Sequence, residues 1–452
     1  MPQHSRRTLY VVLGWLASRV PLYLISTGHL WGWYGQKNLG DVNTYYKWVV
    51  LALNHGALPT DNSWQYPPLV GPLLLLPKIL PGTDYHQQFV KLAFVADAVV
   101  MLTLLWTARR RGSWLGPWFW ILSVPFLGPL IYGRFDVYSA LFVVVALAAL
   151  GKGVQVGGSD GMDTVDGAGG TGLSGAGAGR RELNGRRWLA GALIGLGAAV
   201  KVWPGLTVFG LPRSRRGWQT IAAAVAAGGV ATLVCMFAFT NGTWFLHTQG
   251  SRGIEIESVW ALPLLLADRA HLWHATVRNH YGSIEVIGHG VGAVEKLALL
   301  STVLVFALLA WWWWRKAWRP AVVADATLVA TLLMIVTSRV ISPQYLIWLL
   351  ATAAFCLLNT DSSQRRSALL ILISLPITQW IFPYNFNALR QVHIGPLIVL
   401  IVRDALLVAA AVIGFRDLWR DTVSGPVWPR RRAPKAAVSS QNAEPASDTT
   451  TV

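Results

Sequence analysis

Residues 295–314 read EKLALLSTVLVFALLAWWWW, and the basic residues Arg315 and Lys316 follow directly. Apart from Glu295 and Lys296 the segment carries no charge, and its length matches the roughly 20 apolar residues with which a helix crosses a bilayer. Tryptophan side chains settle at membrane interfaces, and lysine and arginine gather on the cytoplasmic side. The stretch therefore predicts a transmembrane helix whose last turn faces the cytoplasm.

Similar apolar segments recur along the whole chain. Hydrophobic residues make up 54% of the 452 residues and charged residues only 13%, about half the charged share of a soluble domain. We expect an all-α polytopic membrane protein of about 12 transmembrane helices, the first of which is a retained signal anchor because no small-residue cleavage site follows it. The predicted spans are 8–27, 87–108, 115–132, 136–151, 188–201, 203–212, 218–240, 295–314, 321–338, 342–358, 367–383 and 396–415.

Two apolar segments need a separate interpretation. Residues 66–82 (YPPLVGPLLLLPKILPG) contain five prolines, each of which removes a helix donor and strains the preceding turn. We interpret this segment as an interfacial or re-entrant piece. Residues 188–212 have arginines on both flanks and Lys201 and Pro204 in the middle, which predicts a hairpin of two short helices that turns at Lys201.

The distribution of charge predicts the orientation. In a soluble protein a net charge of +17 would suggest nucleic-acid binding, but here the basic residues form short clusters between apolar segments, so nucleic acid is not an expected partner. With the spans above, 24 of the 38 lysines and arginines fall on one side and 11 on the other, and Arg19, Lys91 and Arg403 lie within spans. By the positive-inside rule the richer side is cytoplasmic. We therefore expect a multi-pass protein of the cell (plasma) membrane with both termini in the cytoplasm.

The domain organisation follows from the composition of the connecting segments. We expect one transmembrane domain over residues 1–424, with two long loops, 28–86 and 241–294, on the non-cytoplasmic side. Both loops are too apolar and aromatic to be free linkers, and long ordered loops tend to carry function. Residues 152–187 are rich in glycine and predict a disordered cytoplasmic insertion, and residues 425–452 predict a disordered cytoplasmic tail.

Polar and ionisable residues gather at the non-cytoplasmic ends of the predicted spans and in the two long loops. An ionisable group at the bilayer centre costs about 2.5–3.5 kcal/mol on insertion scales, so such residues near helix ends usually face a protein-lined cavity. Their concentration on one face favours a functional site. They are Asp41, Arg134, Asp136, Lys201, Arg252, Glu255, Glu257, Ser258, Arg339, Ser342, Gln344 and Tyr345.

Each candidate also has a structural explanation. Asp41 fits an exposed helix cap, Lys201 fits a side chain that extends to the interface, and Arg339 fits an interface anchor. Glu255 and Glu257 alternate in a polar loop, so at most one of them points inward if the backbone is extended.

The other polar residues favour a structural role or indicate no specific function. Asp97 and Asp325 lie within spans, where each is expected to pair with a base or a hydroxyl and to serve packing. Cys235 and Cys356 also fall in predicted spans, which supports neither a disulfide nor a metal site. The loop histidines lack the tight spacing of metal ligands. They are His247, His271, His274, His280 and His289.

Several short strings occur in an order and spacing that resemble a known family. They are Asp41 in the first loop, WQYPPL at 64–69, GRFDVY at 133–138, AVKVWP at 199–204, RGIEIESVWA at 252–261 and SPQYLIWLL at 342–350. Together they resemble the GT-C superfamily of membrane glycosyltransferases, and in particular the polyprenol-phosphate-mannose-dependent mannosyltransferases of glycosyltransferase family 87. The likeness covers most of the chain outside the glycine-rich insertion and the tail.

The resemblance implies an inverting hexosyltransferase, with mannose as the favoured sugar. Its donor would be a polyprenyl-phosphate sugar, and its acceptor the hydroxyl of a lipid or glycan at the non-cytoplasmic face. Asp41 corresponds to the family's catalytic base. Because phosphate is a good leaving group, no acid is needed to protonate it, and Lys201, Arg339 and Arg252 would stabilise its charge.

The resemblance also bears on substrate-binding residues and on cofactors. The expected substrate-binding residues are Asp136, Glu257, Gln344, Tyr66 and Trp64, and Trp48 is a further ring able to stack on a sugar. Interface anchoring explains the aromatic residues as well. The chain lacks the paired first-loop acids of metal-dependent relatives, so neither a metal nor another cofactor is expected.

The main alternative is a polytopic transporter or flippase of a lipid-linked sugar. Two features oppose it: the halves of the chain show no internal repeat, and the charges lie on one face instead of at the midplane. A second alternative is an inactive scaffold of cell-envelope assembly that keeps the fold. Besides donor and acceptor, the expected partners are membrane lipids.

Overall fold

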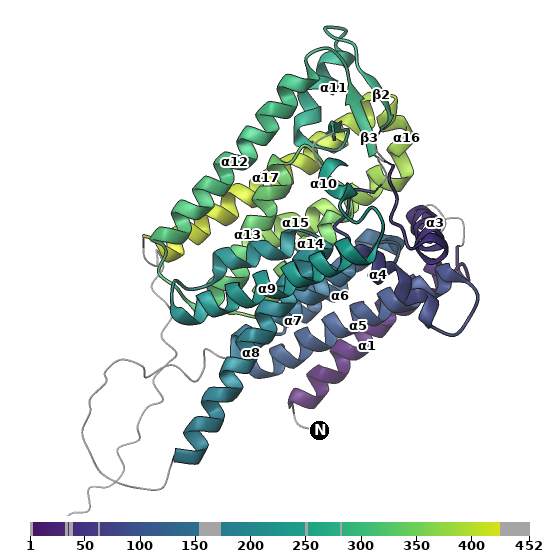
Figure 1. Cartoon of the computed structure of the whole chain (residues 1–452). Coiled ribbons are helices and arrows are strands. Elements are labelled where there is room, and N and C mark those ends of the chain that lie inside the picture. Colours follow the sequence, from purple (N-terminus) through teal and green to yellow (C-terminus); the bar gives the residue numbers. More distant parts are fainter. Residues whose placement is uncertain are drawn as a thin grey trace, which may run out of the picture.

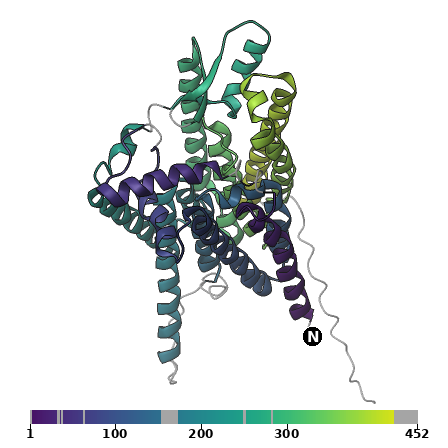
Figure 2. The ribbon, with the colours of Figure 1, turned by 90° about the vertical axis from the view of Figure 1, so that its right-hand side faces the viewer.

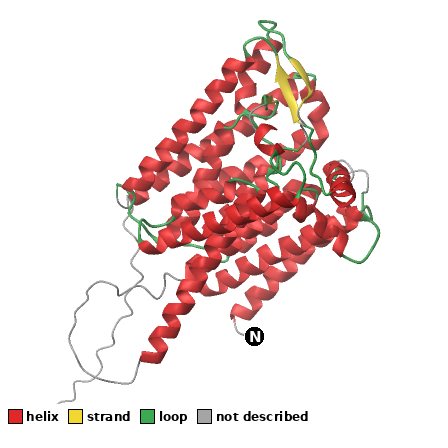
Figure 3. Ribbon diagram, viewed as in Figure 1, coloured by secondary structure: helices red, strands yellow, loops and turns green. Residues whose placement is uncertain are grey.

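The structure is a computed structural model that describes residues 3–31, 35, 39–61, 64–152, 173–248, 252–280 and 283–424. It is mostly helical, with one small sheet (Figures 1 and 3). The first half contains α1 (Gln3–Ser26), α3 (Gly40–His55), α4 (Val70–Leu75), η1 (Leu76–Ile79), α5 (Tyr85–Arg111), α6 (Leu115–Ser123), η2 (Val124–Tyr132), α7 (Asp136–Lys152), α8 (Leu173–Val200) and η3 (Trp203–Gly210). The second half contains α9 (Arg215–Ala238), α10 (Trp244–Thr248), β1 (Ile254–Glu255), η4 (Val259–Ala261), α11 (Leu262–Arg269), β2 (Thr276–His280), β3 (Ser283–Ile287), α12 (Val291–Arg315), α13 (Pro320–Thr337), α14 (Tyr345–Cys356), α15 (Arg365–Gln379), the π-helical η5 (Trp380–Asn385), α16 (Phe386–Arg390) and α17 (Ile394–Thr422).

Eight helical segments of the described residues are long and apolar enough to cross a membrane. They are α1, α5, α6 with η2, α9, α12, α13, α15 with η5 and α16, and α17. The four other predicted spans coincide with α7, the second half of α8, η3 and α14. Because η3 has 8 residues and α14 has 12, neither reaches across a hydrocarbon core of about 30 Å. The chain is a multi-pass membrane protein, and the figure of 12 crossings stays a prediction.

The outer faces of the helices support contact with lipid. On α9, Val225 is 70% exposed and Phe237 is 87% exposed, and on α12 the exposed residues include Leu299 and Leu304. A water-soluble protein rarely leaves so many large apolar side chains side by side on its surface. These faces are therefore stabilised by hydrocarbon, as the composition predicts.

Small residues determine the packing of α8 against α9. A Cβ atom on Gly191 would lie 2.3 Å from the carbonyl oxygen of Thr220, and one on Gly195 would lie 2.0 Å from that of Ala224. The two glycines are four residues apart and therefore lie on one face of α8, where they let the backbones of α8 and α9 approach closely. A side chain at either position would force the two helices apart.

The helix ends define two ends of the bundle. At one, here called the basic end, the end of α5 contacts the turn after α14, and the turn between α12 and α13 contacts the ends of η3 and α17. At the other, here called the site end, α3 contacts the turn before α7, the turn after α8 contacts the start of α7, and β1 contacts the turn after α13. The arginine clusters 109–111, 213–216 and 315–319 all lie at the basic end. This agrees with the prediction that they share one side of the membrane. In Figure 2 the start of α1 and the start of α8 lie at the bottom and the sheet lies at the top.

The two long loops are ordered over their described residues and cover the site end. In the first, α3 runs across the direction of the long helices (Figure 2), and α4 and η1 form a pair of short helices within 66–82. These ten residues are too short to span, which agrees with the interfacial interpretation. The second loop contains a three-stranded antiparallel sheet in the order β1-β3-β2. The expectation of an all-α chain is therefore wrong for the strand residues 254–255, 276–280 and 283–287.

The carboxylates within the spans are paired as predicted. Arg19 Nε donates to Asp97 at 2.9 Å, and both side chains are fully buried. The indole of Trp120 and the hydroxyl of Tyr132 also donate to Asp97, at 2.7 and 2.9 Å. Asp325 accepts a hydrogen bond from the hydroxyl of Ser362, and others from Ser363. Asp97 therefore joins α1, α5, α6 and η2 inside the bundle, and Asp325 joins α13 to the turn between α14 and α15.

The glycine-rich segment is shorter than expected. Helix α8 begins at Leu173, so residues 173–187 of this segment are helical instead of disordered. Residues 153–172 and 425–452, for which disorder is predicted, lie outside the described part of the chain.

Candidate active site

Lys201 occupies the break between α8 and η3. Its backbone N–H still donates to the carbonyl oxygen of Gly197, and Pro204 stands at the start of η3. The hairpin therefore turns at Lys201, as predicted. Lys201 Nζ lies 2.9 Å from Oδ1 of Asp136, the first residue of α7, and Trp348 Nε1 donates to the same oxygen at 2.7 Å. Asp136 is 1% exposed, so its contacts position Lys201 instead of offering the carboxylate to a substrate.

Four aromatic rings surround the ammonium group of Lys201. The ring centroids of Tyr66, Phe135, Tyr345 and Trp348 lie 5.3, 5.0, 5.5 and 5.2 Å from Nζ. Tyr345 and Trp348 are themselves stacked, with centroids 4.1 Å apart. The rings come from the 64–69 loop, the turn before α7 and the start of α14, and each ring face attracts the cation. The cage holds a positive charge in a poorly hydrated place, where its attraction for an anion is stronger than in water.

A second charged pair lies beside the first. Asp41, the second residue of α3, forms an ion pair with Arg134 in the turn between η2 and α7. The side chain of Asp41 is 48% exposed and that of Arg134 is 8% exposed. Burial lowers the pKa of Arg134 to about 10, while the nearby Asp136 and Glu255 oppose the shift, so the guanidinium stays charged at neutral pH. The structure thus brings the first-loop acid and Lys201 into one cluster.

Arg252 completes a group of three cations. It is half-buried and hydrogen-bonded to Tyr345, the first residue of α14. Both Arg252 and Arg134 lie near enough to Lys201 to repel its charge. Arg252 also attracts the carboxylate of Glu255. Three positive side chains from three distant segments therefore converge at the site end.

Arg339 reaches the same region through its backbone. Its carbonyl oxygen accepts a hydrogen bond from the N–H of Glu255 at 2.9 Å, and its side chain is half-buried. Ser342 Oγ donates to Glu255 Oε1 at 3.1 Å. Gln344 is half-buried and directly precedes α14. The 339–345 segment therefore lies against β1 and supplies one wall of the cluster.

The two glutamates of the second loop are both buried, which corrects the expectation that one of them is solvated. Glu255 is 8% exposed and Glu257 is 2% exposed. The expectation of alternation assumed an extended backbone, but the chain turns directly after Glu255. Burial raises the pKa of Glu255 to about 7 and that of Glu257 to about 8, and nearby arginines oppose both shifts. Glu257 faces Arg403 of α17, with Oε2 3.3 Å from Nη2, and not the three cations.

The predicted aromatic sugar platform is only partly available. Trp64 is fully buried and Trp48 is 8% exposed, and the two rings contact each other edge to face at 5.1 Å. Their place in the core excludes both sugar stacking and interface anchoring in this conformation. Tyr66 is half-buried and belongs to the cage of Lys201. Of the three rings, Tyr66 is therefore the one at the charged cluster.

Two residues of the cluster have roles that the sequence did not predict. Arg134 was noted as a polar group, but its pairing with Asp41 joins segments that are far apart in the chain. Trp348 follows Tyr345 by three residues, which places both on one face of α14. The spacing of three residues between Tyr345 and Trp348 in SPQYLIWLL is the feature of the sequence that indicates a place for Trp348 in the cluster.

Within the described residues, the loop histidines and other possible ligands form no cluster for a metal ion. Among the described residues, no group of three or more histidine, cysteine, aspartate or glutamate side chains is arranged to hold a metal ion. The expectation that catalysis needs no metal stays a prediction.

The fold and the site together define a class, a multi-pass membrane protein with a cluster of acids and cations at one end. The sequence model of glycosyltransferase family 87 matches residues 64–343. The chain belongs to this family, which confirms the resemblance seen in its motifs. It is therefore a membrane glycosyltransferase.

Two solved structures are similar to the chain. They are the crystal structures of ArnT from Cupriavidus metallidurans bound to undecaprenyl phosphate and in the apo state. Each has a TM-score of 0.44 and 14% sequence identity, over 91% of this chain and 78% of that one. No curated protein sequence matches the chain.

Proposed function

We propose that the chain is an inverting hexosyltransferase that moves a sugar from a polyprenyl-phosphate donor to the hydroxyl of a lipid or glycan. Membership of family 87 supports glycosyl transfer. The motif resemblance favours a polyprenyl-phosphate donor and mannose as the sugar. The charged cluster supplies the groups that this reaction needs.

The reaction breaks the bond between the sugar C1 and a phosphate oxygen of the donor. The acceptor oxygen attacks C1 from the opposite face, so the configuration inverts. The bonding electron pair leaves with the phosphate, and the acceptor's proton goes to a base. The products are the glycosylated acceptor and polyprenyl phosphate, and no acid is needed because phosphate is a stable leaving group.

Asp41 is the proposed base. It is the half-exposed carboxylate of the cluster, whereas Asp136 and Glu255 are buried. The ion pair with Arg134 fixes the position of the carboxylate, which is the requirement for proton transfer at the moment of attack. A positioned base contributes about 10²–10⁴ in rate.

Lys201 and Arg252 form the proposed phosphate site, Arg339 extends it, and Arg134 holds Asp41 beside it. Charge grows on the phosphate as the sugar leaves, and fixed cations stabilise that charge more than they stabilise the bound donor. The convergence of Lys201, Arg252 and Arg134 from three distant segments is the single observation that carries the proposal, because it offers a bound phosphate several fixed positive charges. Tyr66 and Gln344 line the same region as proposed sugar contacts.

The proposal includes the location of the chemistry. The arginine clusters mark the basic end, so by the positive-inside rule the cluster of Asp41 and Lys201 faces the non-cytoplasmic side of the plasma membrane, with both termini in the cytoplasm. Apolar walls between helices would hold the isoprenoid chain. No metal takes part in this mechanism.

A transfer assay tests the proposal. Purified protein is incubated with radiolabelled polyprenyl-phosphate mannose and a membrane lipid extract, and labelled product is counted. Asp41→Asn should lower the rate by about 10²–10⁴, and Asp84→Asn should change it less than twofold. Asp84 is the matched control because it lies in the same loop and is 50% exposed, against 48% for Asp41.

Other outcomes of the same assay would contradict the proposal. A wild-type rate for Asp41→Asn would remove Asp41 as the base. Movement of the unmodified donor across sealed vesicles, without labelled product, would show transport. Loss of activity with a chelator and its return with a divalent ion would show that a metal is required.

A further inference from the structure

A cavity of about 510 Å³ lies at the basic end, far from the proposed active site. Its walls come from the ends of α5, α7 and α14, the middle of α8, the turn before α9 with the start of α9, and the turn before α13 with the start of α13. Five arginines line it, and no carboxylate is among its described lining residues. They are Arg111, Arg186, Arg187, Arg215 and Arg216.

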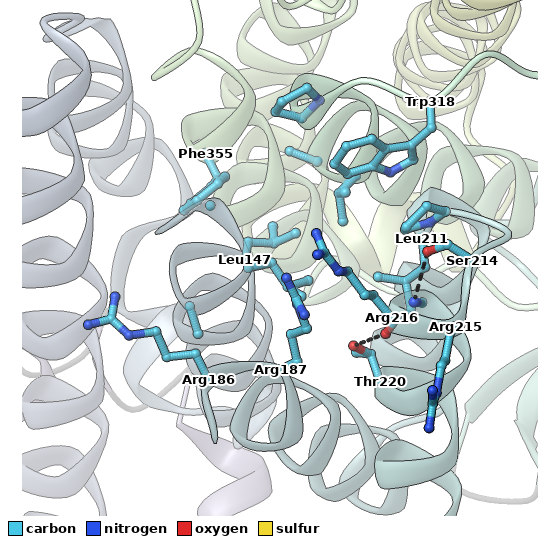
Figure 4. A pocket seen from close by; sticks show the side chains of 18 of the residues that line it. Leu147, Arg186, Arg187, Leu211, Ser214, Arg215, Arg216, Thr220, Trp318 and Phe355 are labelled. Carbon is cyan, nitrogen blue, oxygen red and sulfur yellow. Dashed lines mark hydrogen bonds between the residues drawn. The ribbon is translucent and has the colours of Figure 1, made fainter. Parts of the chain in front are cut away.

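Two of the arginines point into the cavity. In Figure 4 the side chains of Arg187 and Arg216 extend into it from α8 and α9, whereas those of Arg186 and Arg215 point away. Arg187 and Arg216 are near enough to repel each other. The start of α9 adds the partial positive charge of a helix N-terminus. This part of the cavity therefore favours an anion.

The fifth arginine is held in place on another wall. Arg111 contacts the side-chain oxygen of Asn359, and its guanidinium lies over the ring of Phe355 at 5.4 Å. It is thus a fixed cation, in contrast to a mobile surface side chain. A planar guanidinium in such a position suits hydrogen bonding to two oxygens of a phosphate group at once.

The rest of the lining is apolar. Leu147, Leu211, Val323 and Phe355 are buried in the cavity wall, and Trp318 is half-buried there. A free phosphate ion would leave this surface and most of the 510 Å³ without contact. A ligand that carries both a phosphate and hydrocarbon fits the whole cavity.

Tryptophans place the arginines at the depth of lipid headgroups. Trp188 directly follows Arg187 and is 50% exposed, and Trp218 lies two residues after Arg216 and is 55% exposed. Exposed indoles mark the membrane interface. The cationic part of the cavity therefore lies where the phosphates of the adjacent leaflet lie.

We propose that this cavity is a binding site for an anionic phospholipid of the leaflet at the basic end. Arg187, Arg216 and Arg111 would bind the phosphodiester, and the apolar wall would hold the upper part of an acyl chain. Basic pockets between transmembrane helices are known to suit such headgroups. The site is separate from the proposed active site, so its ligand is neither donor nor acceptor.

Native mass spectrometry of the full chain in a neutral detergent tests this. Phosphatidylglycerol is titrated against the wild type, the double variant Arg187→Gln/Arg216→Gln and the control Arg365→Gln/Arg366→Gln. The control pair is also at the basic end, is exposed and removes the same charge, but lies outside the cavity. The first variant should bind about tenfold more weakly than the wild type, and the control should stay within twofold.

A second variant keeps the charges. Ala149→Phe should fill part of the cavity and weaken phosphatidylglycerol binding while leaving all five arginines in place. Thermal unfolding without lipid checks that each variant is folded. If the Arg187/Arg216 pair is too unstable to purify, Ala149→Phe alone decides.

Four results would overturn the proposal. Equal losses in the two arginine pairs would show general attraction to charge. Equal binding of phosphatidylcholine would show that the anion is not recognised. Displacement of the lipid by millimolar inorganic phosphate would show a free-phosphate site. Binding only after deletion of residues 153–172, which contain Asp160, Asp163 and Asp166, would show that the chain itself fills the cavity.

Discussion

Lys201 Nζ lies 2.9 Å from Asp136 Oδ1, and both side chains are almost fully buried. Removing one partner would leave the other charge buried and uncompensated, which costs about 3–5 kcal/mol. We therefore expect Asp136→Leu to lower thermal stability in detergent sharply. Lys201→Met should abolish at least 99% of sugar transfer, because it removes a fixed cation from the proposed phosphate site.

The double variant separates stability from chemistry. Asp136→Leu/Lys201→Met replaces the ion pair with apolar groups and should regain most of the stability while remaining inactive. Unfolding temperature and initial transfer rate are the two measurements. An active double variant would show that Lys201 serves only the fold.

The pair of Arg134 and Asp41 leads to a test of cooperation. If Arg134 acts mainly by holding Asp41, its removal should add little once the acid is gone. We expect Arg134→Gln to slow transfer about 100-fold, and Arg134→Gln/Asp41→Asn to be no slower than Asp41→Asn alone. Rates of all four forms of the enzyme complete the cycle. Multiplicative losses would instead indicate that Arg134 contacts the donor independently.

The buried Glu257 predicts a dependence of stability on pH. Burial raises its pKa from 4.5 in the unfolded chain to about 8, so the folded state binds more protons between these values and stability falls as the pH rises through them. Glu257→Gln resembles the protonated form. We expect it to unfold at the wild-type temperature at pH 5 and at a higher temperature at pH 8.5. A lower temperature at pH 8.5 would mean that the ion pair with Arg403 outweighs burial.

The membrane segments and the turn at Lys201 were predictable because their signals are local. Length, absence of charge and flanking arginines occur within about 20 residues of sequence, and the break at Lys201 is marked by Pro204. The pairing of Asp136 with Lys201 has no local signal, because 65 positions separate the two residues. The family resemblance indicated Lys201 as a site residue, but it did not indicate that Asp136 is the partner of Lys201.

The errors have equally specific causes. The alternation of Glu255 and Glu257 assumed an extended backbone, but β1 ends at Glu255 and the chain turns there. In the sequence, Trp64 does not differ from an exposed aromatic residue of a loop. It is buried because α3 packs against it, and the lengths of the apolar segments do not predict where α3 lies. The start of α8 at Leu173 was missed because glycine lowers helix propensity in any local estimate.

The separation of the two ends predicts which residues are accessible from outside the cell. Asn54 is exposed near the end of α3 at the site end, and Asp361 is exposed in the turn between α14 and α15 at the basic end. The native Cys235 and Cys356 are buried, so the wild type provides the background. With an impermeant maleimide, Asn54→Cys should be labelled on intact cells and Asp361→Cys only after permeabilisation. The reverse pattern would place Asp41 in the cytoplasm, and the donor and acceptor would then have to approach from the cytoplasmic leaflet. The positive-inside assignment would then be wrong for this chain.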